Sequence, residues 1–83
     1  MEPALFADLP DGARATVAHL RAPTLGLEAR QLRRLSEIGF LPGEPVQGLR
    51  RGPGGREPLA VAVGDSLFAL RLAEARHVAV VPA

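Results

Sequence analysis

The two histidines, His19 and His77, are the side chains in this sequence best suited to hold a metal ion. Imidazole nitrogens, together with Asp or Glu carboxylates, can bind a divalent transition metal. The two residues lie far apart in the sequence, and neither has a second ligand at the short spacing of a metal motif. The sequence therefore predicts ordinary histidines at strand ends, with at most a weak, exposed metal site and no expected cofactor.

The hydroxyl side chains do not form a nucleophilic centre. A serine or threonine nucleophile needs a base within hydrogen-bond reach, and no histidine stands beside Thr16, Thr24, Ser36 or Ser66. The chain has no Cys, and it lacks the phosphate-binding patterns GxxxxGK[ST] and GxGxxG. The run GPGG at 52–55 is more simply the tip of a hairpin. We therefore predict that the protein is not an enzyme.

Size and charge favour one small binding domain, which we place at residues 1–83. A chain of 83 residues can build one modest core. The nine acidic residues interspersed among ten basic ones, and the absence of Trp and Tyr for base stacking, argue against nucleic-acid binding. Glu2 and Asp8 stand where a signal peptide would be basic, and no apolar run approaches the ~18 residues that span a membrane. We therefore expect a cytoplasmic protein that does not itself span the membrane.

Residues 27–38 show the spacing of an amphipathic helix. The apolar side chains on one side of a helical wheel are Leu27, Leu32, Leu35 and Ile38. Gly39 is predicted to take the left-handed conformation that ends a helix, with Phe40 packing back on Leu35. Pro42, followed by Gly43, prevents the helix from resuming. One face of this helix is therefore predicted to be buried.

The rest of the sequence has the composition of short strands separated by turn signals. Strands are predicted at 13–21, 44–50, 58–63, 66–71 and 77–81, with a turn at 9–12, a loop at 51–57 and a bend at 72–76. Apolar residues on both faces of 13–21 indicate a bulge or a strand buried on both sides. Gly64 is predicted to supply the positive φ of a two-residue hairpin turn, of type II′ or related. The predicted order is strand, helix, then four strands.

Five short strands with one α-helix inserted after the first favour a mainly β fold, a small SH3-like barrel that closes to avoid bare edges. Three segments also carry a resemblance: Arg34–Val46 (RLSEIGFLPGEPV), Gly54–Arg71 (GGREPLAVAVGDSLFALR) and Glu74–Val81 (EARHVAVV). Together they resemble the FeoA family of ferrous iron transport proteins over almost the whole chain. The three segments together are more diagnostic of this family than the helix end in the first segment alone.

The resemblance implies a cytoplasmic accessory of the membrane GTPase transporter FeoB, acting by protein–protein contact. The barrel also resembles the C-terminal domain of iron-dependent repressors, so the alternative is a stand-alone metal-responsive regulatory domain that binds a divalent ion. A weak site for iron or zinc, involving His19 and His77, and a homodimer both stay open at this point.

The polar face of the predicted helix is the candidate partner surface. Arg30 and Arg33 project away from the apolar side, and Glu37 is placed to pair with Arg33 at i, i+4. Arg34 falls at the border of the apolar stripe, where its stem can rest on the barrel while its guanidinium reaches an acidic partner. The alternative is a merely solvated helix face.

Overall fold

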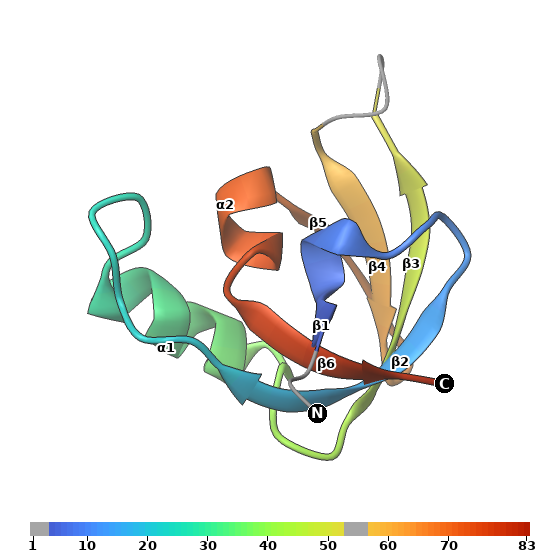
Figure 1. The fold of residues 1–83 in the computed structure, drawn as a ribbon, viewed down its shortest axis with the longest axis horizontal. Coiled ribbons are helices and arrows are strands. Elements are labelled where there is room, and N and C mark those ends of the chain that lie inside the picture. The colour runs from blue at the N-terminus through green and yellow to red at the C-terminus, as the bar shows by residue number, and fades with distance from the viewer. Residues whose placement is uncertain (1–3, 53–56) are drawn as a thin grey trace.

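The computed structural model describes residues 4–52 and 57–83, and these fold around one antiparallel sheet (Figure 1). The sheet order is β1-β6-β2-β3-β4-β5. The strands are β1 (Ala4–Leu5), β2 (Arg14–Leu20), β3 (Pro45–Arg51), β4 (Leu59–Val63), β5 (Ser66–Leu70) and β6 (Val78–Pro82). The helical elements are η1 (Phe6–Asp8), α1 (Ala29–Glu37) and α2 (Leu72–Ala75). The fold is therefore mainly β, as predicted.

Three details of the predicted barrel are wrong. A short strand and a 3-10 turn at residues 4–8 precede the predicted first strand, so the sheet has six strands over residues 4–52 and 57–83, and α1 follows the second. Residues 72–75 form a short helix where a bend was predicted. In the described part of the chain, β1 pairs only with β6 and β5 only with β4, so hydrogen bonds do not close the barrel. The predicted loop at 51–57 falls mostly outside the described residues.

The predicted irregularity in β2 is confirmed as a bulge. The pairing of β2 with β6 shifts register between Val17 and His19. This extra residue explains why apolar side chains occur on both faces of the segment. Val17 still points into the core, with 2% of its surface exposed.

The β4–β5 hairpin turns at Gly64, as predicted. Val63 pairs with Ser66, and Gly64 has a φ of 58°. A type I′ turn needs a positive φ at both central residues, here Gly64 and Asp65. Asp65 does not have one, since no non-glycine residue in ranges 4–52 and 57–83 has a positive φ. The turn is therefore of the II′ class.

Helix α1 begins two residues later than predicted. Leu27 precedes it in a β-bridge with Thr24 but is still buried. At the N-cap, the Glu28 backbone N–H donates to Oε1 of Gln31 over 2.7 Å, which satisfies one of the amides left free at a helix start. The stripe prediction is otherwise confirmed, since Leu32 and Leu35 are buried.

The helix ends in a Schellman motif at Gly39. The Gly39 N–H donates to the Ser36 carbonyl over 3.1 Å, and the Phe40 N–H donates to the Leu35 carbonyl over 3.0 Å. Gly39 has a φ of 121°, a backbone conformation that residues with a Cβ rarely adopt. The predicted helix stop is therefore confirmed, with Phe40 turned back towards Leu35.

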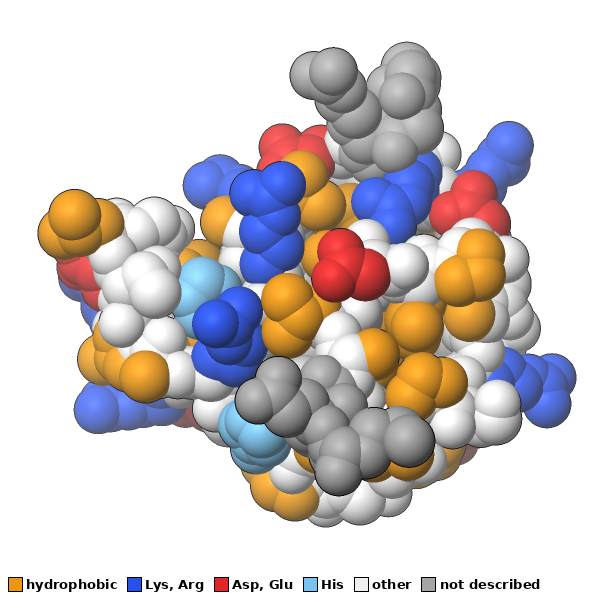
Figure 2. Space-filling model, in the orientation of Figure 1, with side chains coloured by type: hydrophobic (Ala, Val, Ile, Leu, Met, Phe, Trp, Pro, Cys, Tyr) orange, Lys and Arg blue, Asp and Glu red, His pale blue; other side chains and the backbone are white. Residues whose placement is uncertain are grey.

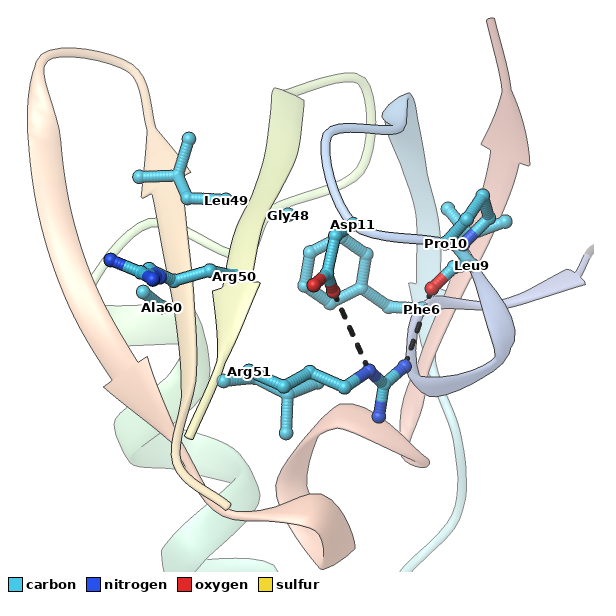
Figure 3. A pocket seen from close by; sticks show the side chains of 10 residues that line it. Phe6, Leu9, Pro10, Asp11, Gly48, Leu49, Arg50, Arg51 and Ala60 are labelled. Atoms are coloured by element: carbon cyan, nitrogen blue, oxygen red, sulfur yellow. Dashed lines mark hydrogen bonds and ion pairs between the residues drawn. The ribbon is translucent and has the colours of Figure 1, made fainter. Parts of the chain in front are cut away.

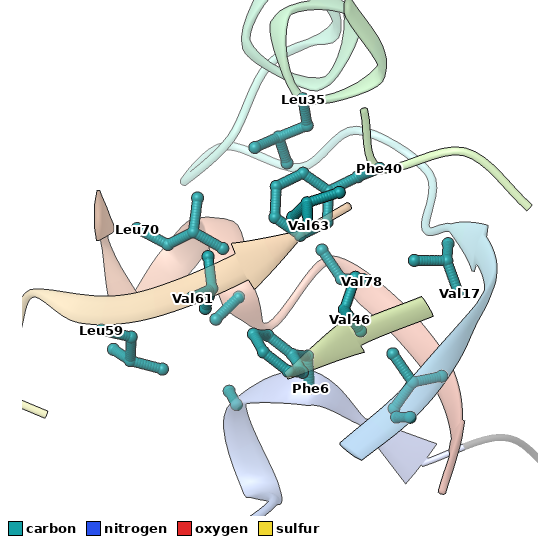
Figure 4. Packing of buried hydrophobic residues seen from close by; sticks show 14 of the residues in the cluster. Phe6, Val17, Leu35, Phe40, Val46, Leu59, Val61, Val63, Leu70 and Val78 are labelled. Atoms are coloured by element: carbon teal, nitrogen blue, oxygen red, sulfur yellow. The ribbon is translucent and has the colours of Figure 1, made fainter. Parts of the chain in front are cut away.

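The core lies between the curved sheet and the end of α1 (Figure 4). Phe40, Val61, Val78 and Val80 are completely buried. Figure 4 shows Leu35 and Phe40 entering this core from the helix end, near Val63 of β4. The helix is thus anchored by its C-terminal turn.

Candidate functional site

A cleft of about 420 Å³ lies between α1, β5 and α2. Leu27, Leu35 and Leu70 form its buried lining. Half-buried Ile38 and Phe68 supply further apolar surface, and the charged rim consists of Arg34, Arg71 and Glu74. An apolar floor with a polar, charged rim suits a protein segment rather than a reacting small molecule.

The structure brings only one of the predicted partner-binding residues into this cleft. Arg34 lines it, whereas Arg30, Arg33 and Glu37 are exposed outside it. The predicted ion pair between Arg33 and Glu37 does not form: within residues 4–52 and 57–83, the ion pair present joins Arg51 to Asp11. Both helix side chains extend into solvent, where such pairs contribute little and are easily lost.

The two histidines do not assemble a metal site. His19 is exposed on β2, whereas His77 precedes β6 and is 8% exposed. The His77 Nδ1 lies 2.8 Å from the Ala73 carbonyl, and its Nε2 lies 3.2 Å from Oγ1 of Thr24. Since a carbonyl only accepts, Nδ1 is the donor, and in the neutral ring Nε2 accepts from the threonine hydroxyl. Both ring nitrogens of His77 are therefore used within the fold.

Within ranges 4–52 and 57–83, the acidic side chains do not complete a metal site with either histidine. No group of three or more His, Cys, Asp or Glu side chains is gathered at one point among the described residues. A divalent ion bound by one histidine and solvent would be held weakly.

A second hollow lies beside η1, where Arg51 crosses from β3 to the N-terminal segment (Figure 3). The Arg51 guanidinium donates to the carbonyls of Ala7 and Leu9 over 2.5 and 3.3 Å, and its Nε lies 3.7 Å from Oδ1 of Asp11. The hollow holds about 10 Å³, roughly the space for one water. Arg51 therefore fastens the N-terminal segment to the sheet, and this hollow is not a ligand site.

Surface charge does not form a basic strip on the face seen in Figure 2. The blue side chains there are spread over the face, and acidic, apolar and other side chains lie between most of them. Arg51, one of the ten basic residues, donates its hydrogen bonds to the carbonyls of Ala7 and Leu9. The face seen in Figure 2 therefore offers no continuous track for a phosphate backbone.

Comparison with protein families identifies the chain, because the FeoA domain model matches residues 6–82. The chain belongs to the FeoA family. Members are small SH3-like proteins of ferrous iron transport, so this FeoA chain has a role in that process. No curated protein sequence is significantly similar to the chain.

Solved structures support the same assignment. FeoA of Stenotrophomonas maltophilia, an SH3 domain protein complexed with zinc and suggested as an activating factor of ferrous iron transport, is 40% identical. The alignment covers 93% of this chain and 88% of that one, with a TM-score of 0.79. FeoA of Chlorobium tepidum is 29% identical over 95% of this chain and 70% of its own, with a TM-score of 0.81.

The fold also occurs in larger regulators. A manganese-dependent transcriptional repressor is 21% identical, with a TM-score of 0.80. The alignment covers all of this chain but only 44% of the repressor, so it shows a shared fold alone.

In this FeoA chain, no described helix is long and apolar enough to cross a membrane.

Proposed function

We propose that this FeoA protein is a non-enzymatic, cytoplasmic accessory of ferrous iron uptake that binds a FeoB-like membrane GTPase transporter. Its match to the FeoA family over residues 6–82 carries the proposal. The whole chain acts as one module, and its partner recruits it to the inner face of the membrane.

The cleft between α1, β5 and α2 is the docking surface in this proposal. Apolar side chains of the transporter would be buried against Ile38 and Phe68, which supplies most of the affinity. Arg34 at the rim would meet an acidic side chain, since guanidinium matches carboxylate geometry. Arg30 and Arg33 lie outside the cleft and contribute only general attraction.

Arg34→Glu should weaken binding to the cytoplasmic domain of FeoB by about tenfold or more, because it replaces an attraction at the rim by a repulsion. Arg33→Glu is the matched control, since it makes the same charge change on the same helix outside the cleft. Titration calorimetry at low and high salt measures both. The wild-type affinity should fall as salt rises.

Equal losses in the two variants would mean that only net charge matters and would remove the cleft from the proposal. Unchanged binding in a well-folded Arg34→Glu variant would contradict the role of this arginine. Phe68→Ala then tests whether the apolar wall alone holds the partner.

The alternative, a metal-responsive regulator, draws support from the zinc complex of the Stenotrophomonas maltophilia relative. Anaerobic titration of this FeoA protein with ferrous iron, and separately with zinc, should show only weak binding. His77 can join a metal through Nε2 only by giving up its hydrogen bond to Thr24. Sub-micromolar binding that His19→Ala or His77→Ala abolishes would favour the regulator instead.

A further inference from the structure

Strand β5 is an unprotected edge of the sheet. It pairs with β4 along its full length of Ser66–Leu70, and its other side has no strand partner in ranges 4–52 and 57–83. At the opposite edge, the described part of β1 spans Ala4–Leu5 and turns at once into η1. Proteins usually protect a longer edge with charges, proline or a bulge, because an open edge pairs with other chains. Residues 66–70, SLFAL, contain none of these.

The hairpin register shows which backbone groups face outwards. Ser66, Phe68 and Leu70 pair with Val63, Val61 and Leu59. In a hairpin closed by a two-residue turn, these pairs exchange both backbone hydrogen bonds, whereas the alternate residues point away from the neighbour. The N–H and C=O groups of Leu67 and Ala69 therefore point to the open edge.

The side chains at this edge are also accessible. Leu67 is 72% exposed and Ala69 is exposed. The cleft of about 420 Å³ leaves space beside residues 68–71. An apolar, hydrogen-bonding edge with room next to it is suited to receive a strand.

We propose that β5 pairs with β5 of a second copy of this chain, antiparallel about a two-fold axis at Phe68. Leu67 of each copy then lies opposite Ala69 of the other, so the outward backbone groups of both residues find partners. This pairing joins two sheets into one and goes beyond the proposed docking of FeoB. Both would use the space beside residues 68–71, so a chain paired in this way does not bind FeoB in the cleft.

Charge fixes the register of this pairing. With Phe68 on the axis, Asp65, in the turn just before β5 of one copy, comes level with Arg71, just after β5 of the other. Opposite charges therefore meet at both ends of the paired strands. A shift of the register by two residues removes both charge pairings. Depending on the direction of the shift, Asp65 then comes level with Ala69, or Arg71 comes level with Leu67. Asp65 and Arg71 are exposed, and neither forms an ion pair within the described residues. Glu74 accepts from the Arg71 backbone N–H over 2.8 Å.

Charge exchange tests the register in sedimentation equilibrium of the purified full chain. Asp65→Arg and Arg71→Asp should each weaken dimerisation by about tenfold or more, because each variant places like charges opposite one another twice. An equimolar mixture of the two variants, and the double variant Asp65→Arg/Arg71→Asp, should both regain dimers. Circular dichroism of each variant controls for folding.

Amide hydrogen exchange supplies an independent readout. The amides of Leu67 and Ala69 should gain protection as protein concentration rises, while those of Phe68 and Leu70, already bonded to β4, should not change. Leu67→Lys should abolish both dimerisation and this protection.

A wild-type chain that remains monomeric up to about 1 mM would overturn the proposal. A dimer whose Asp65→Arg and Arg71→Asp variants are not rescued by mixing would also overturn it. If the amides of Leu67 and Ala69 are protected from exchange to the same degree at every protein concentration, the edge is covered within one copy. That result would overturn the proposal as well.

Discussion

Phe40→Ala should lower the free energy of unfolding by about 3 to 5 kcal/mol, the usual loss for a buried phenylalanine. Phe40 is completely buried and packs where the end of α1 meets the sheet, so its removal leaves a cavity that two elements border. A domain of 83 residues has a total stability of about 4 to 12 kcal/mol. This single truncation should therefore remove a large share of it, and urea unfolding followed by circular dichroism measures the loss.

The neighbouring Leu41→Ala is the matched control. Leu41 is 47% exposed, so its truncation should cost less than about 1 kcal/mol. If the two variants unfold at the same urea concentration, the end of α1 does not pack on the sheet as described.

Gly39→Val should destabilise the protein by about 2 to 4 kcal/mol, through two separate effects. The φ of 121° at this helix stop is strained for a β-branched residue. A Cβ at Gly39 would also lie 3.1 Å from Cγ1 of Val63, which is buried and has little room to move. Thermal unfolding measures the sum.

Gly43→Val separates the two effects. Gly43 also has a positive φ, of 89°, but a Cβ there meets nothing within 4 Å. This variant should show the backbone strain alone and so be the milder of the two. Equal losses would mean that Val63 does not crowd the helix end.

The correctly predicted elements are those that short stretches of sequence specify. The stop at Gly39 and the turn at Gly64 depend on glycine conformations, and the apolar stripe of Leu32 and Leu35 depends on helical spacing. Each signal acts within a few residues, so one sequence is enough to read it.

The missed features depend on contacts between distant segments. Strand β1 exists because Ala4 and Leu5 pair with Val80 and Ala79. Arg51 bonds to carbonyls more than 40 residues away, and no local pattern marks it. The sequence predicts Arg34 at the border of the stripe, but the cleft that it lines also needs β5 and α2, whose positions tertiary packing decides.

The position of β6 determines when the sheet can be completed during synthesis. Although β6 follows every other strand in the sequence, it lies inside the sheet, between β1 and β2. Strands β3, β4 and β5 are sequence neighbours that pair with one another, so this meander can form while the chain is still growing. Strand β1 is made first but has no sheet partner until residues 78–82 leave the ribosome. The N-terminal strand therefore cannot join the sheet before translation has passed β6.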